Sequence, residues 1–174
     1  VFIEKKALEG VFVKPCERHG LALGACKGYP SLTFLHDATK RFTEARDRGQ
    51  KPIIIYFGDY DPSGEDIPRA LAENIKSLGC PEIEVRRVAL NEWQVIDWKL
   101  PPAPTKVTDS RSAKWDGLGQ VELDAVKPET LISLLEAEVR KLFDEELHDD
   151  LLHREASERE SFRAELRRYV EEEL

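Results

Sequence analysis

Three carboxylates stand at positions suited to binding a divalent cation: Glu4, Asp59 and Asp61. Glu4 follows a short apolar run at residues 1–3, and the two aspartates follow a strongly β-prone run at residues 53–57. Carboxylates that are held close together repel one another and lose hydration, so their ordinary use is to share a hard cation. The pattern predicts binding of Mg²⁺, or of Mn²⁺ in its place, together with water and a substrate phosphate.

The segment that carries the two aspartates, residues 58–64, also has the composition of a phosphate-binding turn. Gly58 and Gly64 allow the backbone to approach a ligand closely. Ser63 and Gly64 open a predicted helix, where unpaired N–H groups favour a phosphate. Asp and Gly are also common in plain turns, which account for this segment somewhat better when it is taken alone. Its combination with Glu4 favours a site.

Basic residues near these positions are candidates for contacting a phosphate backbone. Lys5 adjoins the first acid, and Lys27 precedes the turn at residues 28–30, at the end of a predicted strand. Lys106 and Arg111 belong to a polar stretch that is able to fold over the site. The alternative is that all of them are ordinary solvated side chains, and the sequence leaves both readings open.

To position the acids, the chain needs a sheet of parallel strands. Strand-like and helix-like segments alternate over the first half, with strands expected at 1–3, 21–26, 53–57 and 83–89 and helices within 5–19, 31–49 and 62–79. This alternation predicts an α/β fold, a Rossmann-like parallel sheet of about four strands flanked by helices. Ligands bind outside the carboxyl ends of such strands, so the three acids converge if the first and third strands are neighbours.

The second half of the chain lacks this alternation. Prolines at 101, 102 and 104 and a polar stretch after them predict an irregular loop region over 90–120. After Pro128, apolar residues recur at helical spacing. We therefore expect an α/β domain over 1–120, with its motifs in 1–90, and an acidic helical extension over 121–174. The extension is expected to pack on the domain or on a partner, with a homodimer through these helices as one arrangement.

The charge of the chain is unevenly distributed. Its 174 residues carry 26 Lys and Arg against 34 Asp and Glu, a formal charge of −8. Residues 1–50 sum to +3, residues 51–120 to −2 and residues 121–174 to −9. The acidity thus lies mostly in the helical extension, so it does not exclude DNA as a partner; it predicts that the extension points away from DNA.

Other features of the composition bound the class of protein. No apolar run approaches the roughly 18 residues that cross a bilayer. The three cysteines, Cys16, Cys26 and Cys80, have neither disulfide-framework nor zinc-site spacing, which favours a reducing, cytoplasmic setting. The chain begins at Val1 inside an apolar stretch, so we expect it to be a fragment or an excised domain.

Three motifs together resemble the Toprim domain, in the version found in the A subunit of topoisomerase VI and its meiotic double-strand-break relatives. They are Phe2-Ile3-Glu4-Lys5, Lys27-Gly28-Tyr29-Pro30, and Ile55-Tyr56-Phe57-Gly58-Asp59-Tyr60-Asp61-Pro62-Ser63-Gly64. The resemblance covers residues 1 to about 90. It implies a small parallel sheet flanked by helices, with Mg²⁺ used to break or join nucleic-acid backbones. It also implies that Glu4, Asp59 and Asp61 are metal ligands, or that Glu4 is a general acid or base.

One departure from the family leaves the nucleophile open. Topoisomerase VI A subunits carry a nucleophilic tyrosine on a winged-helix domain before the Toprim domain, whereas Tyr29, Tyr56, Tyr60 and Tyr169 do not fill that role here. Either an upstream DNA-binding portion is missing, or the chain resembles OLD-type nucleases, in which an ATPase domain precedes and metal-activated water attacks. A non-catalytic Toprim-like module that binds nucleic acid or nucleotide is the rival reading. A receiver-type signalling domain ranks third.

Overall fold

Four short parallel strands form the centre of the computed structural model, which describes residues 1–26, 28–102 and 119–172. The strands are β1 (Phe2–Ile3), β2 (Gly24–Ala25), β3 (Ile53–Phe57) and β4 (Glu84–Ala89), in the order β2-β1-β3-β4. Every pairing between neighbours is parallel, with Phe2 opposite both Gly24 and Tyr56. The predicted α/β class with a four-stranded parallel sheet is confirmed, and β1 and β3 are neighbours as the convergence of the acids requires.

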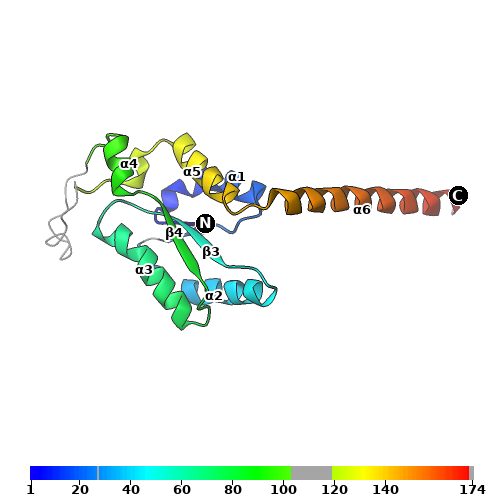
Figure 1. Ribbon diagram of the computed structural model, residues 1–174, viewed down its shortest axis with the longest axis horizontal. Coiled ribbons are helices and arrows are strands. Elements are labelled where there is room, and N and C mark those ends of the chain that lie inside the picture. The colour runs from blue at the N-terminus through cyan, green and yellow to red at the C-terminus, as the bar shows by residue number, and fades with distance from the viewer. Residues whose placement is uncertain (27, 103–118, 173–174) are drawn as a thin grey trace. The chain divides into compact units, whose positions relative to one another are not determined.

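Helices cover both faces of this sheet (Figure 1). On one face lie α2 (Leu32–Asp47) and α3 (Pro62–Ser77), whose apolar residues share a buried cluster with Phe2, Ile54 and Tyr56 of the strands. The opposite face is packed by α1 (Glu9–Arg18), where the Phe12 ring lies 4.7 Å from that of Phe57. Because successive residues of β3 point to opposite faces, its nearly continuous apolar run is buried on both sides, as expected for a central parallel strand.

The region after β4 is more ordered than the sequence analysis expected. A short helix, α4 (Glu92–Asp97), follows the last strand, and the side chain of Gln94 accepts a hydrogen bond from the Asn91 N–H at its start. After residues 103–118, which lie outside the described residues, come the 3-10 turn η3 (Leu123–Ala125) and α5 (Pro128–Arg140). The expected irregular region therefore contains one helix within its described part.

The chain divides into two compact units, Val1–Glu138 and Val139–Leu174. The sequence analysis placed the start of the helical extension at 121, whereas residues 121–138 lie in the first unit. Arg18 and His19 at the end of α1 both contact Glu136 of α5, and Arg86 of β4 contacts Glu138. The second unit contains α6 (Glu145–Glu172), the longest of the described helices. None of the described helices has the length and apolarity to span a membrane.

Candidate functional site

Glu4 begins the site, at the carboxyl end of β1. Its N–H donates to the carbonyl of Phe57, which places the residue beside the end of β3. Its Oε2 accepts hydrogen bonds from the hydroxyl of Tyr56 at 3.1 Å and from the N–H of Asp59 at 3.0 Å. Burial raises the pKa of Glu4, the nearby charges of Asp59 and Asp61 raise it further, and the two hydrogen bonds act in the opposite direction. Glu4 is thus a half-buried acid in contact with the aspartate loop.

Asp59 follows β3 and is held from two sides. Its Oδ1 accepts a hydrogen bond from the N–H of Leu123 at 2.7 Å and lies 3.7 Å from Nζ of Lys5. Burial raises the pKa of Asp59, whereas the hydrogen bond from Leu123 and the Lys5 charge lower it. The next residue, Tyr60, pairs through its backbone with Val121. The first turn after β3 is therefore tied to the segment that precedes α5.

Asp61 is the N-cap of α3. Its Oδ1 accepts the Gly64 N–H at 2.6 Å, and Pro62 occupies the first position of the helix, where a missing N–H costs nothing. The cap explains locally why the helix starts here. It also means that the Gly64 N–H, which the sequence analysis assigned to a phosphate, is already used within the protein.

Gly58 and Gly64 are required by close packing around Glu4. A Cβ on Gly64 would lie 2.2 Å from the Asp59 carbonyl oxygen and 3.2 Å from Glu4 Oε2. A Cβ on Gly58 would lie 2.7 Å from the same oxygen and 2.4 Å from the Tyr56 hydroxyl. Both glycines therefore make room for the Glu4 carboxylate and its partners, and Gly64 is in contact with groups of all three acidic residues.

The sequence analysis missed Arg87, the cation that fixes this loop. Its guanidinium donates to the carbonyls of Gly64, Asp59 and Leu90. Burial lowers its pKa, and the charges of Glu4 and Asp61 are among those that offset this. The available signal was the pair Arg86-Arg87 between the apolar residues Val85 and Val88 of a predicted strand, since a charged side chain that is buried needs partners.

Lys5 lies among carboxylates. Its Nζ is 3.0 Å from Glu122, 3.4 Å from Asp124 and 3.7 Å from Asp59, with 21% of the side chain exposed. Residues 121–125, which we term the acidic strap, thus reach the site through Lys5 as well as through the Leu123 N–H. Lys5 neutralises part of the acidic charge, and to contact a phosphate its ammonium would have to leave these partners.

The structure describes only one of the remaining residues that were predicted to contact phosphate. Ser63 lies in the first turn of α3, beside Asp61. Lys27, Lys106 and Arg111, which were predicted to contact phosphate, lie outside the described residues.

The carboxylate oxygens of Glu4, Asp59 and Asp61 meet some of the requirements of a site for a hard cation. The described residues contain no ready-made group of three or more His, Cys, Asp or Glu side chains at metal-binding geometry. Within the same residues, however, none donates a hydrogen bond to the second oxygen of Glu4, Asp59 or Asp61. Mg²⁺ commonly binds through one or two carboxylates, completing its octahedron with water and substrate phosphate. The acids therefore suit such an open site rather than a closed cage.

The tyrosines of the first unit are engaged with acids. Tyr56 is fully buried, and burial beside Glu4 raises its pKa. Tyr60 is also buried and donates to Glu92 at 3.2 Å, while Tyr29 donates to Asp66.

Comparison of the chain with protein-family models, with curated proteins and with solved structures gave no match.

Proposed function

We propose that this chain is a Toprim-type domain that binds Mg²⁺ through Glu4, Asp59 and Asp61 and acts on phosphodiester bonds of DNA. The proposal rests on the three motifs in the sequence and on the neighbouring, parallel placement of β1 and β3. That placement is what brings Glu4 and the Asp59-x-Asp61 loop to one edge of the sheet, outside the carboxyl ends of the strands, where α/β proteins bind ligands.

One observation carries the proposal: Glu4 and the aspartate loop meet at the ends of β1 and β3, where the Asp59 N–H donates to Glu4 Oε2 at 3.0 Å and burial raises the pKa of both acids. Burial is the main cause in both, and the charge of Asp61 raises both further. Buried acids held close together lower the stability of the fold, and such groups with perturbed pKa values are found mainly at functional sites. A divalent cation at this position would reduce the repulsion and favour the ionised forms.

In this proposal the three acids have different roles. Glu4 accepts hydrogen bonds on one oxygen, and its raised pKa suits it to take a proton from a nucleophile or return one to a leaving oxygen. One oxygen of Asp59 accepts from Leu123 and one oxygen of Asp61 caps α3, which leaves the second oxygen of each for the cation. Bound Mg²⁺ would supply stabilisation of the charge that develops on the scissile phosphate.

The nucleophile in this proposal is water or a tyrosine supplied from outside the described residues of the first unit. Tyr56 and Tyr60 are buried, and their hydroxyls already donate to Glu4 and Glu92. With water, attack on phosphorus breaks one phosphorus–oxygen ester bond, and a proton moves from the water to the leaving oxygen. With a tyrosine, the same displacement leaves the phosphate esterified to the protein.

A plasmid-nicking assay tests the proposal. Supercoiled DNA is incubated with the chain at increasing Mg²⁺ or Mn²⁺, and conversion to the open-circular form is measured. Glu4→Gln and Asp61→Asn are expected to lose the metal-dependent activity, because each removes a charge but keeps an oxygen for its hydrogen bonds. Glu65→Gln is the matched control, an exposed acid in the first turn of α3. Equal nicking by all four proteins would contradict the site assignment.

A second candidate function is a Toprim-like module that binds nucleic acid without cleaving it. It is favoured by the absence of a three-ligand group among the described residues and by the use of the Gly64 N–H as a cap contact. It predicts DNA binding by the wild-type chain that is retained in Glu4→Gln, with no nicking by either protein.

A further inference from the structure

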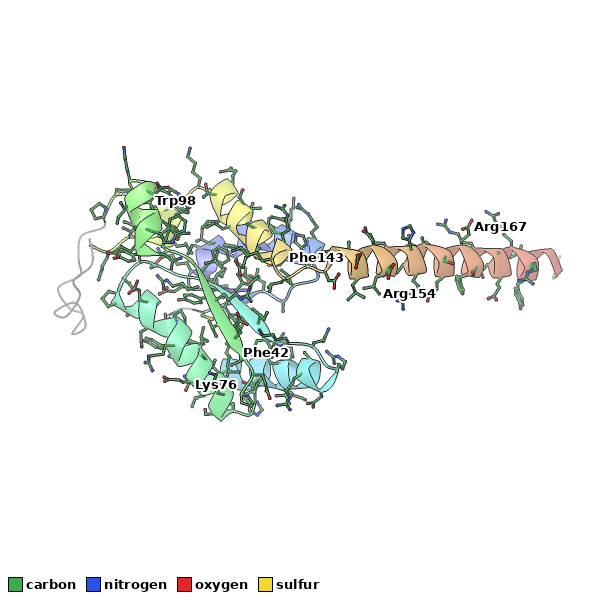
Figure 2. The ribbon with its side chains drawn as sticks, in the orientation of Figure 1. Phe42, Lys76, Trp98, Phe143, Arg154 and Arg167 are labelled. Atoms are coloured by element: carbon green, nitrogen blue, oxygen red, sulfur yellow. The ribbon has the colours of Figure 1, made fainter. Side chains whose placement is uncertain are left out.

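A cavity of about 220 Å³ lies at the end of the acidic strap, and none of the three acids lines it. It is lined by Trp98 and Leu100 after α4, by Ala125 and Val126 at the end of the strap, and by Lys127 and Thr130 at the start of α5. Figure 2 labels Trp98 at the end of α4. Pockets for drug-sized ligands usually measure roughly 300–1,000 Å³. This cavity is therefore suited to one planar ring system rather than to a whole cofactor.

The lining combines an aromatic wall with polar groups. The Trp98 ring meets that of Trp93 edge to face, with centroids 6.1 Å apart and planes at 69°. This contact orients the Trp98 ring. Trp93 itself is 58% exposed and offers a second aromatic surface. Lys127 adds a cation and Thr130 a hydroxyl at the same cavity. A flat aromatic face beside a lysine is the combination by which proteins hold unpaired bases of single strands.

Residues that line the cavity are close in the chain to residues that contact the proposed cleavage site. Leu123 donates to Asp59, and Ala125 and Val126, two and three residues later, line the cavity. On the other side, Glu92 at the start of α4 accepts from Tyr60, which stands between the two aspartates of the loop. The lining of the cavity is thus joined, within three residues of the chain, to a segment that contacts Asp59.

We propose that this cavity is a nucleobase subsite: a base of single-stranded DNA stacks on Trp98, and Lys127 contacts the adjoining phosphate. The proposal rests on the proposed function, since it places an unpaired base next to the site of phosphodiester chemistry. Asp97, Asp124 and Glu129 adjoin lining residues in the chain, and their charges oppose a long DNA backbone here. The subsite accordingly recognises a single unstacked nucleotide, and its selectivity comes from the base.

Fluorescence anisotropy of labelled oligonucleotides tests this subsite in the full chain, with EDTA present so that no cleavage occurs. An oligothymidylate and an abasic oligonucleotide of equal length are compared. The wild type is expected to prefer the oligothymidylate by about tenfold, the scale of one base–aromatic stack. Trp98→Leu is expected to abolish this preference, and Lys127→Ala to weaken the binding of both oligonucleotides. Lys76→Ala, an exposed lysine at the far end of α3, should change neither.

Equal affinity of the wild type for the two oligonucleotides, or a Trp98→Leu protein that keeps the preference, would overturn the subsite. If Trp98→Leu does not fold, as judged by its thermal melting, the wild-type comparison and the Lys127 variant still decide. The outcome is separable from that of the proposed function. Base-dependent binding without metal-dependent nicking supports the subsite alone, and nicking without base preference supports the metal site alone.

Discussion

The Glu4 carboxylate is half-buried, and this environment disfavours its ionised form. Burial is the largest cause of its raised pKa, and the neighbouring acids add to it. An acid whose pKa is higher in the folded state than in the unfolded state contributes most stability below its unfolded value, near 4.3, and that contribution is lost as the pH rises through the folded value. As the pH rises, the cost of ionising Glu4 in the folded state therefore works against folding.

Glu4→Gln is accordingly expected to melt at or above the temperature of the wild type at pH 7 without metal. A gain of about 0.5–2 kcal/mol is the usual range for a stabilising substitution. The advantage should shrink below pH 4, where Glu4 is protonated in both states. Thermal unfolding at the two pH values measures this, and a variant that is less stable at pH 7 would show that the ionised form is needed for the fold.

A matched pair of glycine substitutions tests the packing around Glu4. Gly64→Ala would place a Cβ 2.2 Å from the backbone oxygen of Asp59, which has no room to move, so a loss of roughly 1–3 kcal/mol is expected. Gly10→Ala in α1 meets nothing within 4 Å and should gain about 0.5–1 kcal/mol from helix propensity. Denaturant unfolding of both variants checks this. Equal effects would mean that Gly64 is not held against Asp59.

At the scale of elements, the loop after β3 depends on Arg87 of β4. A single guanidinium satisfies the carbonyls of Gly64, Asp59 and Leu90, and it is half-buried. Arg87→Met keeps much of the apolar stem but leaves these acceptors unpaired. We expect a loss of about 2–4 kcal/mol in unfolding free energy. Arg69→Met, which removes exposed bonds to Asp66 and Glu73, is the control and should change stability far less than Arg87→Met.

The sequence was sufficient for the elements whose patterns are local. The apolar run of β3, the start of α3 at Pro62 and the placement of acids after two strands were all predicted, because each depends on neighbouring residues. The role of Asp61 as the N-cap of α3 was not predicted. The six-residue α4 is too short to show helical periodicity, and its signal was only Asn91 with Gln94 three positions later. The role of the acidic strap was not predictable, since its contacts with Asp59 and Lys5 join residues more than 60 positions apart.

At the scale of the whole molecule, acidic charge is concentrated at the end of the chain. Residues 141–174 hold six Lys and Arg against twelve Asp and Glu, so their removal changes the formal charge from −8 to −2. Apart from half-buried His148, the described side chains of residues 146–170 are exposed, so the charge that they carry is available to repel a phosphate backbone. The first compact unit, residues 1–138, contains all the described groups of the site.

Removal of residues 141–174 is therefore expected to tighten DNA binding several-fold at low salt. The difference should fade as salt screens the exposed charges, whose range is about 10 Å at 0.1 M. Anisotropy titrations at two salt concentrations measure this, and circular dichroism of the shortened chain controls for folding. A loss of DNA binding by a folded shortened chain would place the DNA contacts in the second unit instead.

The central claim is that the acids at the ends of β1 and β3 bind a divalent cation. Titration with Mn²⁺, followed by the electron paramagnetic resonance signal of the free ion, tests it without requiring catalysis. The wild type and Glu65→Gln are expected to remove Mn²⁺ from solution with equal affinity, and Mg²⁺ should release it. Glu4→Gln and Asp61→Asn should each bind at least tenfold more weakly, about 1.4 kcal/mol. Unchanged Mn²⁺ affinity in both variants, with the fold intact, would contradict the assignment.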